Sequence, residues 1–107
     1  MIKRLVKLTF RNDQTAEFVQ IFEESKQKIL AREGCLHVEL LRGIAHNNIF
    51  FTLSIWENEA ALEAYRQSQL FIQTWARTKA LFADKAEAWS LDIVSAAESS
   101  IPDHCIS

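Results

Sequence analysis

Two side chains that can accept a proton, His37 and Glu39, lie two positions apart in a run of alternating apolar residues. Because alternate residues of a strand project from the same face, both are expected on one face of a predicted strand. Histidine titrates near neutral pH, so His37 is a candidate general base. The alternative is a surface pair on an exposed edge or subunit interface, balanced by Lys7 or Arg42.

A second group of residues is aromatic. The chain has three tryptophans and one tyrosine, and Trp56, Tyr65 and Trp75 all fall within residues 54–75. Large rings that arrive from a strand end and two helices, beside the alanines of residues 60–64, predict gaps and hence the wall of a pocket for a flat ligand. The alternative is a filled core, because Phe71 and Trp75 form an i, i+4 pair that is typical of packing.

The elements that position these residues follow from the periodicity of apolar side chains. Alternation predicts strands over residues 2–10, 35–42, 49–56 and 86–94. Helical spacing predicts a first helix that begins at Asn12 or Asp13 and ends at Gly34, a short helix from Asn58 to about Gln67, and another over residues 70–83. This order predicts an α+β domain, the ferredoxin-like split β-α-β fold with a four-stranded antiparallel sheet, over residues 1–94, followed by a tail over residues 95–107.

Composition excludes several classes of function. The net charge is −2 without a basic run, which argues against nucleic acid, and no apolar run is long enough to span a membrane. Two glycines rule out a glycine-rich phosphate loop. Cys35 and Cys105 fit no metal or redox spacing, and the adjacent Asp103, His104 and Cys105 lack further ligands, so no metal is expected. Without a signal-peptide pattern, a cytoplasmic protein is expected.

The predicted strands carry apolar residues on both faces. Leu5, Phe50 and Trp56 lie on the parity that would otherwise be polar. A sheet covered by helices on one face only would leave more apolar surface in water than a monomer normally tolerates. A homodimer that closes sheet on sheet is therefore expected.

Three short motifs resemble the antibiotic biosynthesis monooxygenase family of dimeric α/β barrels, most closely its quinol-monooxygenase-like branch. They are Gly34-Cys35-Leu36, Glu39-Leu40, and Trp56-Glu57 leading into Ala60-Ala61-Leu62, and the resemblance covers roughly residues 1–94. It implies a homodimer with an apolar cavity between sheet and helices. It also implies a monooxygenase that uses O2 on a quinol-like or polycyclic aromatic substrate without flavin, haem or metal. An alternative is a dimeric module that binds a small hydrophobic ligand or acts as an isomerase.

The resemblance also suggests roles for individual residues. Trp56 matches a strand-end tryptophan that lines the cavity of polyketide-oxidising members, which adds it to His37 as a catalytic candidate. Thr52 stands where those members carry an asparagine, and Gln69 where many carry a histidine. Haem-degrading members carry a tryptophan and an iron-binding histidine at the positions of Tyr65 and Trp75, and tryptophan cannot replace that ligand. The predicted substrate-binding residues are Thr52, Tyr65, Gln69, Phe71 and Trp75.

Overall fold

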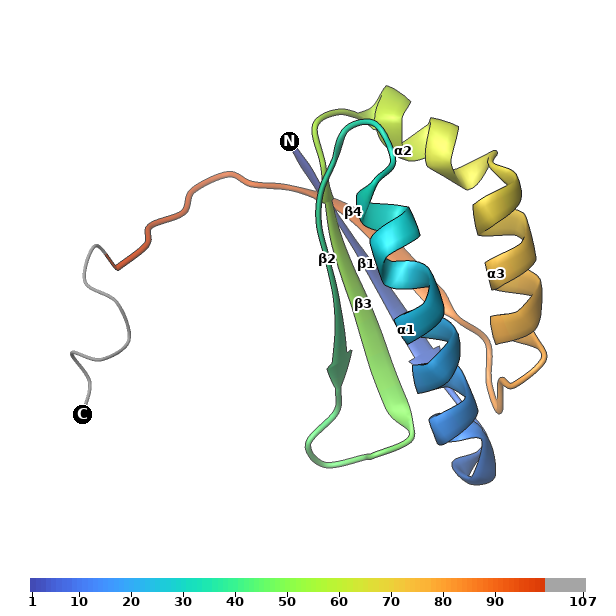
Figure 1. Ribbon diagram of the computed structural model, residues 1–107. Helices are drawn as coiled ribbons and strands as arrows, with labels where there is room; N and C mark the ends of the chain where they lie inside the picture. The colour runs from blue at the N-terminus through green and yellow to red at the C-terminus, as the bar shows by residue number, and fades with distance from the viewer. Residues whose placement is uncertain (100–107) are drawn as a thin grey trace.

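The computed structural model describes residues 1–99 and shows one sheet with every helix on the same side (Figure 1). In chain order the elements are β1 (Ile2–Thr9), the 3-10 turn η1 (Asn12–Gln14), α1 (Thr15–Leu30), β2 (Cys35–Arg42), β3 (Ile49–Trp56), α2 (Glu59–Arg66), α3 (Gln69–Lys79) and β4 (Glu87–Asp92). The strand order is β2-β3-β1-β4, and all neighbours are antiparallel. This confirms the predicted ferredoxin-like α+β fold. The sheet of the single chain is open rather than a closed barrel.

The register of the strands aligns the side chains that face the helices into rows across the sheet. One row consists of Val38, Ser54, Arg4 and Ser90, and the next consists of Leu40, Thr52, Val6 and Ala88. On either side of these rows, the central strands carry large apolar side chains, with Leu8 opposite Phe50 and Ile2 opposite Trp56. The helix-facing side of the sheet is therefore apolar at both ends and partly polar in the middle.

The hydrophobic core follows this pattern and divides into two clusters. The first contains Leu8, Phe10, Phe18, Phe22 and Phe50, and the second contains Ile2, Ile29, Trp56 and Leu62. Phe10 stacks on Phe18 with 4.3 Å between ring centroids, and both rings meet Phe50 edge-on. Each cluster joins one end of the sheet to a helix, so the middle of the sheet is not needed to anchor α1.

Of the helix boundaries predicted at Asn12 or Asp13, at Gly34 and at Asn58, the one at Asn58 is confirmed in full. Asn58 caps α2 as predicted, since its side-chain oxygen accepts the amide of Ala61 at 2.9 Å. Asn12 and Asp13 instead form the 3-10 turn η1, and α1 begins after Gln14 without a side-chain cap. Gly34 has the expected positive φ of 81°, but α1 already ends at Leu30.

The predicted helix over residues 70–83 begins one residue earlier and ends at Lys79. Residues 81–83 leave the helix because their backbone groups pair with the end of β1: the Arg11 amide donates to Leu81, and the Ala83 amide donates to Thr9. Phe82 forms an isolated bridge with Phe10 as a result. Phe82 therefore packs on the first cluster from a loop, whereas the sequence pattern placed it on the helix stripe.

The other face of the sheet is uncovered within residues 1–99 (Figure 1). Phe51, Leu53 and Ile55 occupy its centre, while Leu41, Trp89 and Leu91 are between 42% and 45% exposed. β4 ends at Asp92, two residues before the predicted end, and residues 93–99 extend away from the sheet without regular structure. The domain boundary at residue 94 stays a prediction, because positions 100–107 of the predicted tail lie outside the described residues.

Candidate functional site

A cavity of ≈ 340 Å³ lies between the middle of the sheet and the three helices. Its floor is formed by side chains from the two central rows of the sheet, and its ends are closed by the two core clusters. From the helices it is lined by Ile21, Ser25, Ile29, Leu62, Tyr65, Arg66, Phe71, Thr74, Trp75 and Thr78, among others. Ala88 on the edge strand β4 is both a lining residue and exposed, so the cavity is open along β4.

The floor carries polar groups at its centre. The Arg4 guanidinium donates to the Ser90 hydroxyl at 3.0 Å. The indole N–H of Trp56 donates to the Ser54 hydroxyl at 2.9 Å. The Thr52 hydroxyl makes no hydrogen bond to another side chain or backbone group within residues 1–99, so it can bind a ligand oxygen.

Aromatic rings form a continuous series along one side of the cavity. Trp56 stacks on Tyr65 at 5.0 Å, Tyr65 meets Phe71 edge-on at 5.3 Å, and Phe71 stacks parallel to Trp75 at 5.9 Å. Trp75 then meets Phe82 edge-on, which connects the series to the first core cluster. Tyr65, Phe71 and Trp75 line the cavity, whereas Trp56 is fully buried behind Tyr65. The rings provide flat apolar faces of the kind that bind an aromatic ligand.

Tyr65 is a lining residue that combines an aromatic ring with a phenol hydroxyl. Burial raises its pKa to about 12, with a smaller contribution from nearby Cys35, while Arg32 opposes the shift. The phenol is therefore neutral at physiological pH and can donate a hydrogen bond. It makes no hydrogen bond to another group within residues 1–99, so that donor is available to a ligand.

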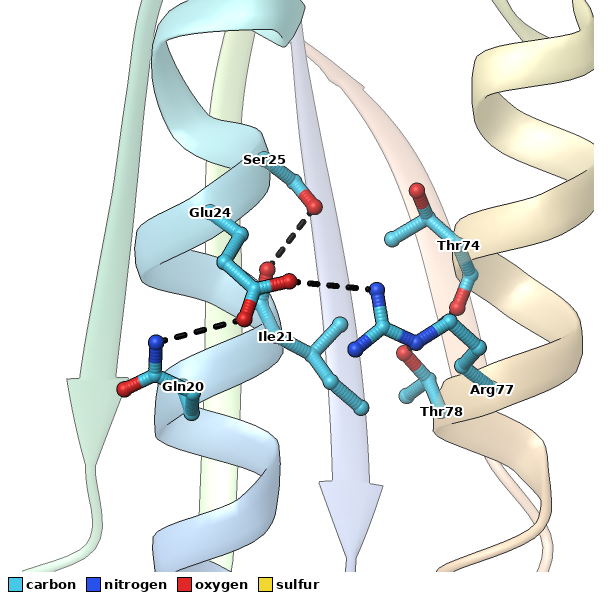
Figure 2. A network of polar contacts seen from close by, with 7 residues as sticks. All are labelled: Gln20, Ile21, Glu24, Ser25, Thr74, Arg77 and Thr78. Carbon is cyan, nitrogen blue, oxygen red and sulfur yellow. Dashed lines mark hydrogen bonds and ion pairs between the residues drawn. The ribbon is translucent and has the colours of Figure 1, made fainter.

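The wall formed by α1 and α3 is held together by polar contacts (Figure 2). The Glu24 carboxylate lies between Gln20, at 3.2 Å, and the Arg77 guanidinium of the other helix, at 3.3 Å. The hydrogen bond from Gln20, and then that from Arg77, hold the pKa of Glu24 below its ordinary value. The buried hydroxyls of Ser25 and Thr78 donate to carbonyls of their own helices, Ile21 and Thr74. These two hydroxyls already have partners, so this wall presents mainly apolar surface to a ligand.

His37 and Glu39 do not line the cavity. Both lie on the opposite face of the sheet, since His37 pairs with Ile55 and Glu39 with Leu53. Their side chains contact each other at 2.6 Å between Nε2 and Oε1, rather than Lys7 or Arg42. Lys7 instead pairs with Glu87 at 3.8 Å. A β-bulge between Cys35 and His37 sets this orientation.

The structure thus brings together four of the seven predicted site residues around one cavity: Thr52, Tyr65, Phe71 and Trp75. Trp56 supports this group from behind through Tyr65 and Ser54. Gln69 is exposed at the first position of α3 and does not line the cavity, and His37 lies across the sheet. What each of the seven residues does for a substrate stays a prediction.

Two lining residues, Arg4 and Arg66, were not among the predicted site residues. Arg4 was visible in the sequence as the one charged residue on the apolar parity of the first strand. Burial lowers its pKa, and the neighbouring Arg66 lowers it further, while Glu63 raises it. A cation placed among apolar side chains is the signal in the sequence that could have identified this residue as part of a site.

No metal site or membrane span emerges from residues 1–99. Within that range, no group of three or more histidine, cysteine, aspartate or glutamate residues is arranged to hold a metal ion. No helix there has both the length and the apolar composition to cross a membrane. The predicted non-ligands Asp103, His104 and Cys105 lie outside the described residues.

A match to a protein-family model extends over most of the chain and identifies the class of protein. The family model described as antibiotic biosynthesis monooxygenase matches residues 1–77, and the chain belongs to this family. No curated protein sequence matches the chain significantly.

Solved structures show the same fold. A protein from Caulobacter crescentus with the provisional name antibiotic biosynthesis monooxygenase is 22% identical, with a TM-score of 0.82 over 88% of this chain and 90% of that chain. A conserved protein from Methanosarcina mazei is 18% identical, with a TM-score of 0.81 over 84% and 89%. A structure named antibiotic biosynthesis monooxygenase, without a stated organism, is 17% identical, with a TM-score of 0.83 over 89% and 100%. At these identities the likeness establishes the fold and not the reaction.

Proposed function

We propose that the protein is a cofactor-independent monooxygenase that acts with O2 on a quinol-like or polycyclic aromatic small molecule. The observation that carries this proposal is the cavity of ≈ 340 Å³, which has a series of aromatic rings along one side and whose lining includes Thr52 and Tyr65, two residues whose hydroxyls have no partner within residues 1–99. Flat apolar walls with a few polar groups suit a ring system that bears oxygen substituents. Membership of the monooxygenase family supports the same reaction class.

The proposed reaction requires the substrate to supply all the electrons. In an anthrone-like substrate one oxygen atom of O2 replaces the two hydrogens of a CH2 group as a carbonyl, and the other leaves with those hydrogens as water. In a quinol one oxygen atom enters at a ring C–H to give a hydroxyquinone, and the other leaves as water with the two hydrogens that the quinol loses. The protein's part is to bind the substrate flat against the rings of Phe71 and Trp75, to hydrogen-bond its oxygens through Tyr65 and Thr52, and to limit water around the reactive anion. Trp56 fixes the position of Tyr65 by stacking on it.

The direct test is oxygen uptake by the purified protein with a panel of reduced quinones and anthrone-like compounds. We expect uptake above the rate of spontaneous oxidation, and a loss of that excess in Phe71→Ala. Ile72→Ala is the matched control, because Ile72 is the next residue of α3 and is 50% exposed. Failure of every compound to give protein-dependent uptake would refute the oxygenase proposal.

Tyr65→Phe tests the proposed hydrogen bond. The substitution keeps the ring that stacks on Trp56 and removes only the hydroxyl. Loss of one neutral hydrogen bond should weaken ligand binding by about 0.5–1.5 kcal/mol with little change in the free energy of unfolding. Unchanged affinity for every ligand that binds would show that the hydroxyl is not a ligand contact.

His37 remains the predicted general base, and its position makes the prediction testable. The sheet separates it from the cavity of its own chain. His37→Gln should strongly lower oxygen uptake if His37 accepts the substrate proton. Unchanged uptake would assign the proton to another acceptor.

The second candidate function is a dimeric module that binds a small hydrophobic ligand, or an isomerase. One observation favours it: among the described lining residues the cavity has no histidine, carboxylate, lysine or cysteine. Binding without turnover needs no proton acceptor. Tight binding of aromatic ligands together with no oxygen uptake would support this alternative.

We also propose that the protein is a homodimer that buries the uncovered face of the sheet. Phe51, Leu53 and Ile55 at its centre, and the partly exposed Trp89 and Leu91 beside them, form an apolar surface that a second copy would cover. An obligate interface should bury on the order of 2,000 Å² or more. Light scattering should give the dimer mass at micromolar concentration, and Leu53→Lys should shift it to the monomer. Leu30→Lys, at an exposed leucine on α1, is the matched control. A stable monomer of the unmodified protein would refute the proposal.

A further inference from the structure

Arg4 occupies an unusual place for a charged residue, the centre of a cavity floor. It lies on β1 between Ile2 and Val6 on the helix-facing side, with Ser54 on one neighbouring strand and Ser90 on the other. Neighbouring positions in this part of the sheet carry small or apolar side chains. A structural residue at this position would more simply be apolar, because a partly buried cation loses part of its hydration.

The partners that Arg4 has do not neutralise it. Its one hydrogen bond within residues 1–99 goes to the neutral hydroxyl of Ser90, and a guanidinium has five N–H donors. None of the described lining residues carries a carboxylate. Within residues 1–99 Arg4 forms no ion pair, although the nearby Glu63 carboxylate raises its pKa, and its side chain lines open cavity space.

A second guanidinium adds to the positive charge at this end of the cavity. Arg66 on α2 lines the cavity and also a second depression, whose lining includes Ser90 and the carboxylates of Glu59 and Glu63. The electrostatic effect of Arg66 on Arg4 is repulsive, so the two cations are close enough to interact. Glu63 forms an exposed ion pair with Arg66 at 3.3 Å, which only partly offsets this charge. Two guanidinium groups that line the same cavity favour an anion between them.

We propose that Arg4, assisted by Arg66, binds an oxyanion of the ligand, and that the substrate is therefore a flat aromatic compound bound as its phenolate, enolate or carboxylate anion. The rings of Tyr65, Phe71 and Trp75 then hold the aromatic part, while the anionic oxygen points toward the β4 side of the floor. This inference rests on the proposed function for its aromatic substrate, and it specifies the charge of that substrate.

The inference also accounts for the absence of a base among the described lining residues. A guanidinium beside a phenol or enol stabilises the anion and so lowers the pKa of the ligand itself. The ligand can then lose its proton without an acceptor in the cavity, and the electron-rich anion is the form that can react with O2. Tyr65, with a pKa of about 12, stays protonated and contributes a donor rather than a proton acceptor.

Binding of matched aromatic probes to the full-length protein tests the inference without any turnover. The probes are naphthoate, which is an anion, and naphthalenemethanol, a neutral compound of similar size, measured by calorimetry. We expect naphthoate to bind at least about tenfold more tightly than the alcohol, and this preference to shrink as salt is raised. Equal affinity of the two probes for the unmodified protein would overturn the proposal.

Variants assign the preference to Arg4. Arg4→Gln should weaken naphthoate binding about tenfold or more and leave the alcohol within about twofold, because a charge-assisted hydrogen bond is lost. Lys79→Gln removes the same charge from an exposed site on α3 and should leave both affinities unchanged. If Arg4→Gln weakens both probes equally, its role is structural and the proposal fails. The unfolding midpoint of Arg4→Gln is measured first, because only a folded variant can be compared. If the variant does not fold, the preference of the unmodified protein for naphthoate over the alcohol decides the proposal.

A coloured probe distinguishes the kinds of oxyanion. The phenolate of para-nitrophenol is yellow and its phenol is colourless, so absorbance reports the pKa of the bound probe. A tenfold preference for phenolate lowers that pKa by one unit, and Arg4→Gln should restore it. A lowered pKa identifies phenolates as ligands, whereas an unshifted pKa with tight naphthoate binding identifies carboxylates, and both support oxyanion binding. Anion preference without oxygen uptake would leave this inference intact and refute the oxygenase proposal.

Discussion

Gly34 controls how closely α2 approaches the sheet, and its replacement by alanine should be strongly destabilising. The residue has a φ of 81°, a conformation that side chains with a Cβ atom adopt at a cost. A methyl group there would overlap the Cβ atom of Ala61 on α2. The Gly34 carbonyl also accepts the Glu57 amide at 2.9 Å, immediately before the Asn58 cap. The loop and the helix are therefore held together at this contact.

The cost of Gly34→Ala has two separable parts. The left-handed backbone costs an alanine about 1–2 kcal/mol, and forcing an extra methyl into a packed contact costs about 1–3 kcal/mol. Together they predict a loss of about 2–5 kcal/mol in the free energy of unfolding, a large share of the ~5–15 kcal/mol that a domain normally has. Ala61→Gly alone should cost up to about 1 kcal/mol through helix propensity.

A double-mutant cycle measured by urea unfolding separates the two parts. In the Ala61→Gly background the overlap is gone, so Gly34→Ala should then cost only the backbone part, about 1–2 kcal/mol. Additivity of the two substitutions within about 0.5 kcal/mol would refute the contact, and a loss below about 1 kcal/mol for Gly34→Ala alone would refute the whole argument. Tryptophan fluorescence gives a second readout, because a displaced α2 would move Tyr65 away from Trp56.

Three further predictions concern single residues around the cavity. Tyr65 is the only tyrosine, so its ultraviolet titration should give a native pKa near 12 and about 10 in denaturant. Because the folded state holds the proton more tightly, about 2–3 kcal/mol of stability should be lost as pH rises from 10 to 12. A native pKa of 10 would contradict the burial argument. Trp56→Phe should cost about 1–3 kcal/mol in urea unfolding, since a fully buried ring shrinks and the Ser54 hydrogen bond is lost. Glu24 has a lowered pKa, so the stability it adds is present above its unfolded pKa and is lost as pH falls through its folded pKa. Glu24→Gln should remove that part of the loss of stability in acid. An unchanged dependence of the free energy of unfolding on pH would show that the contact with Arg77 contributes nothing.

The sequence was sufficient for the fold because each strand alternates and each helix has a clear apolar stripe. Asn58 predicted the start of α2 because an asparagine before a run of helix formers has a specific capping function. The end of α3 was not predictable in the same way. Residues 81–83 have helical propensity, but their backbone groups pair with Thr9 and Arg11, which are distant in sequence. Such tertiary pairing overrides local preference and leaves no local signal.

The candidate site was predicted only in part for a similar reason. Alternation shows that Thr52 and Trp56 share a face of β3, but it does not show which face the helices cover. On β3, the alternate residues with strongly apolar side chains, Phe51, Leu53 and Ile55, face away from the helices. The other alternate residues of β3, which are partly polar, face the helices and include the cavity-lining residues. The bulge after Cys35 likewise has no local signature, although it fixes His37 on the outer face. Arg4 was visible as an exception in the pattern, but its meaning depends on which face it occupies.

The distribution of apolar residues explains how this small domain can keep an open cavity at its centre. Leu8 with Phe50 and Ile2 with Trp56 anchor opposite ends of the central strands to α1 and α2. Between them, Arg4, Thr52 and Ser54 belong to neither cluster, and only Val6 packs against the first one. A ligand that fills the space supplies packing contacts to the floor of the cavity, and an anionic ligand also supplies a negative charge to pair with Arg4. Ligand binding should for this reason stabilise the fold, and should do so more for an anion than for a neutral compound of the same shape.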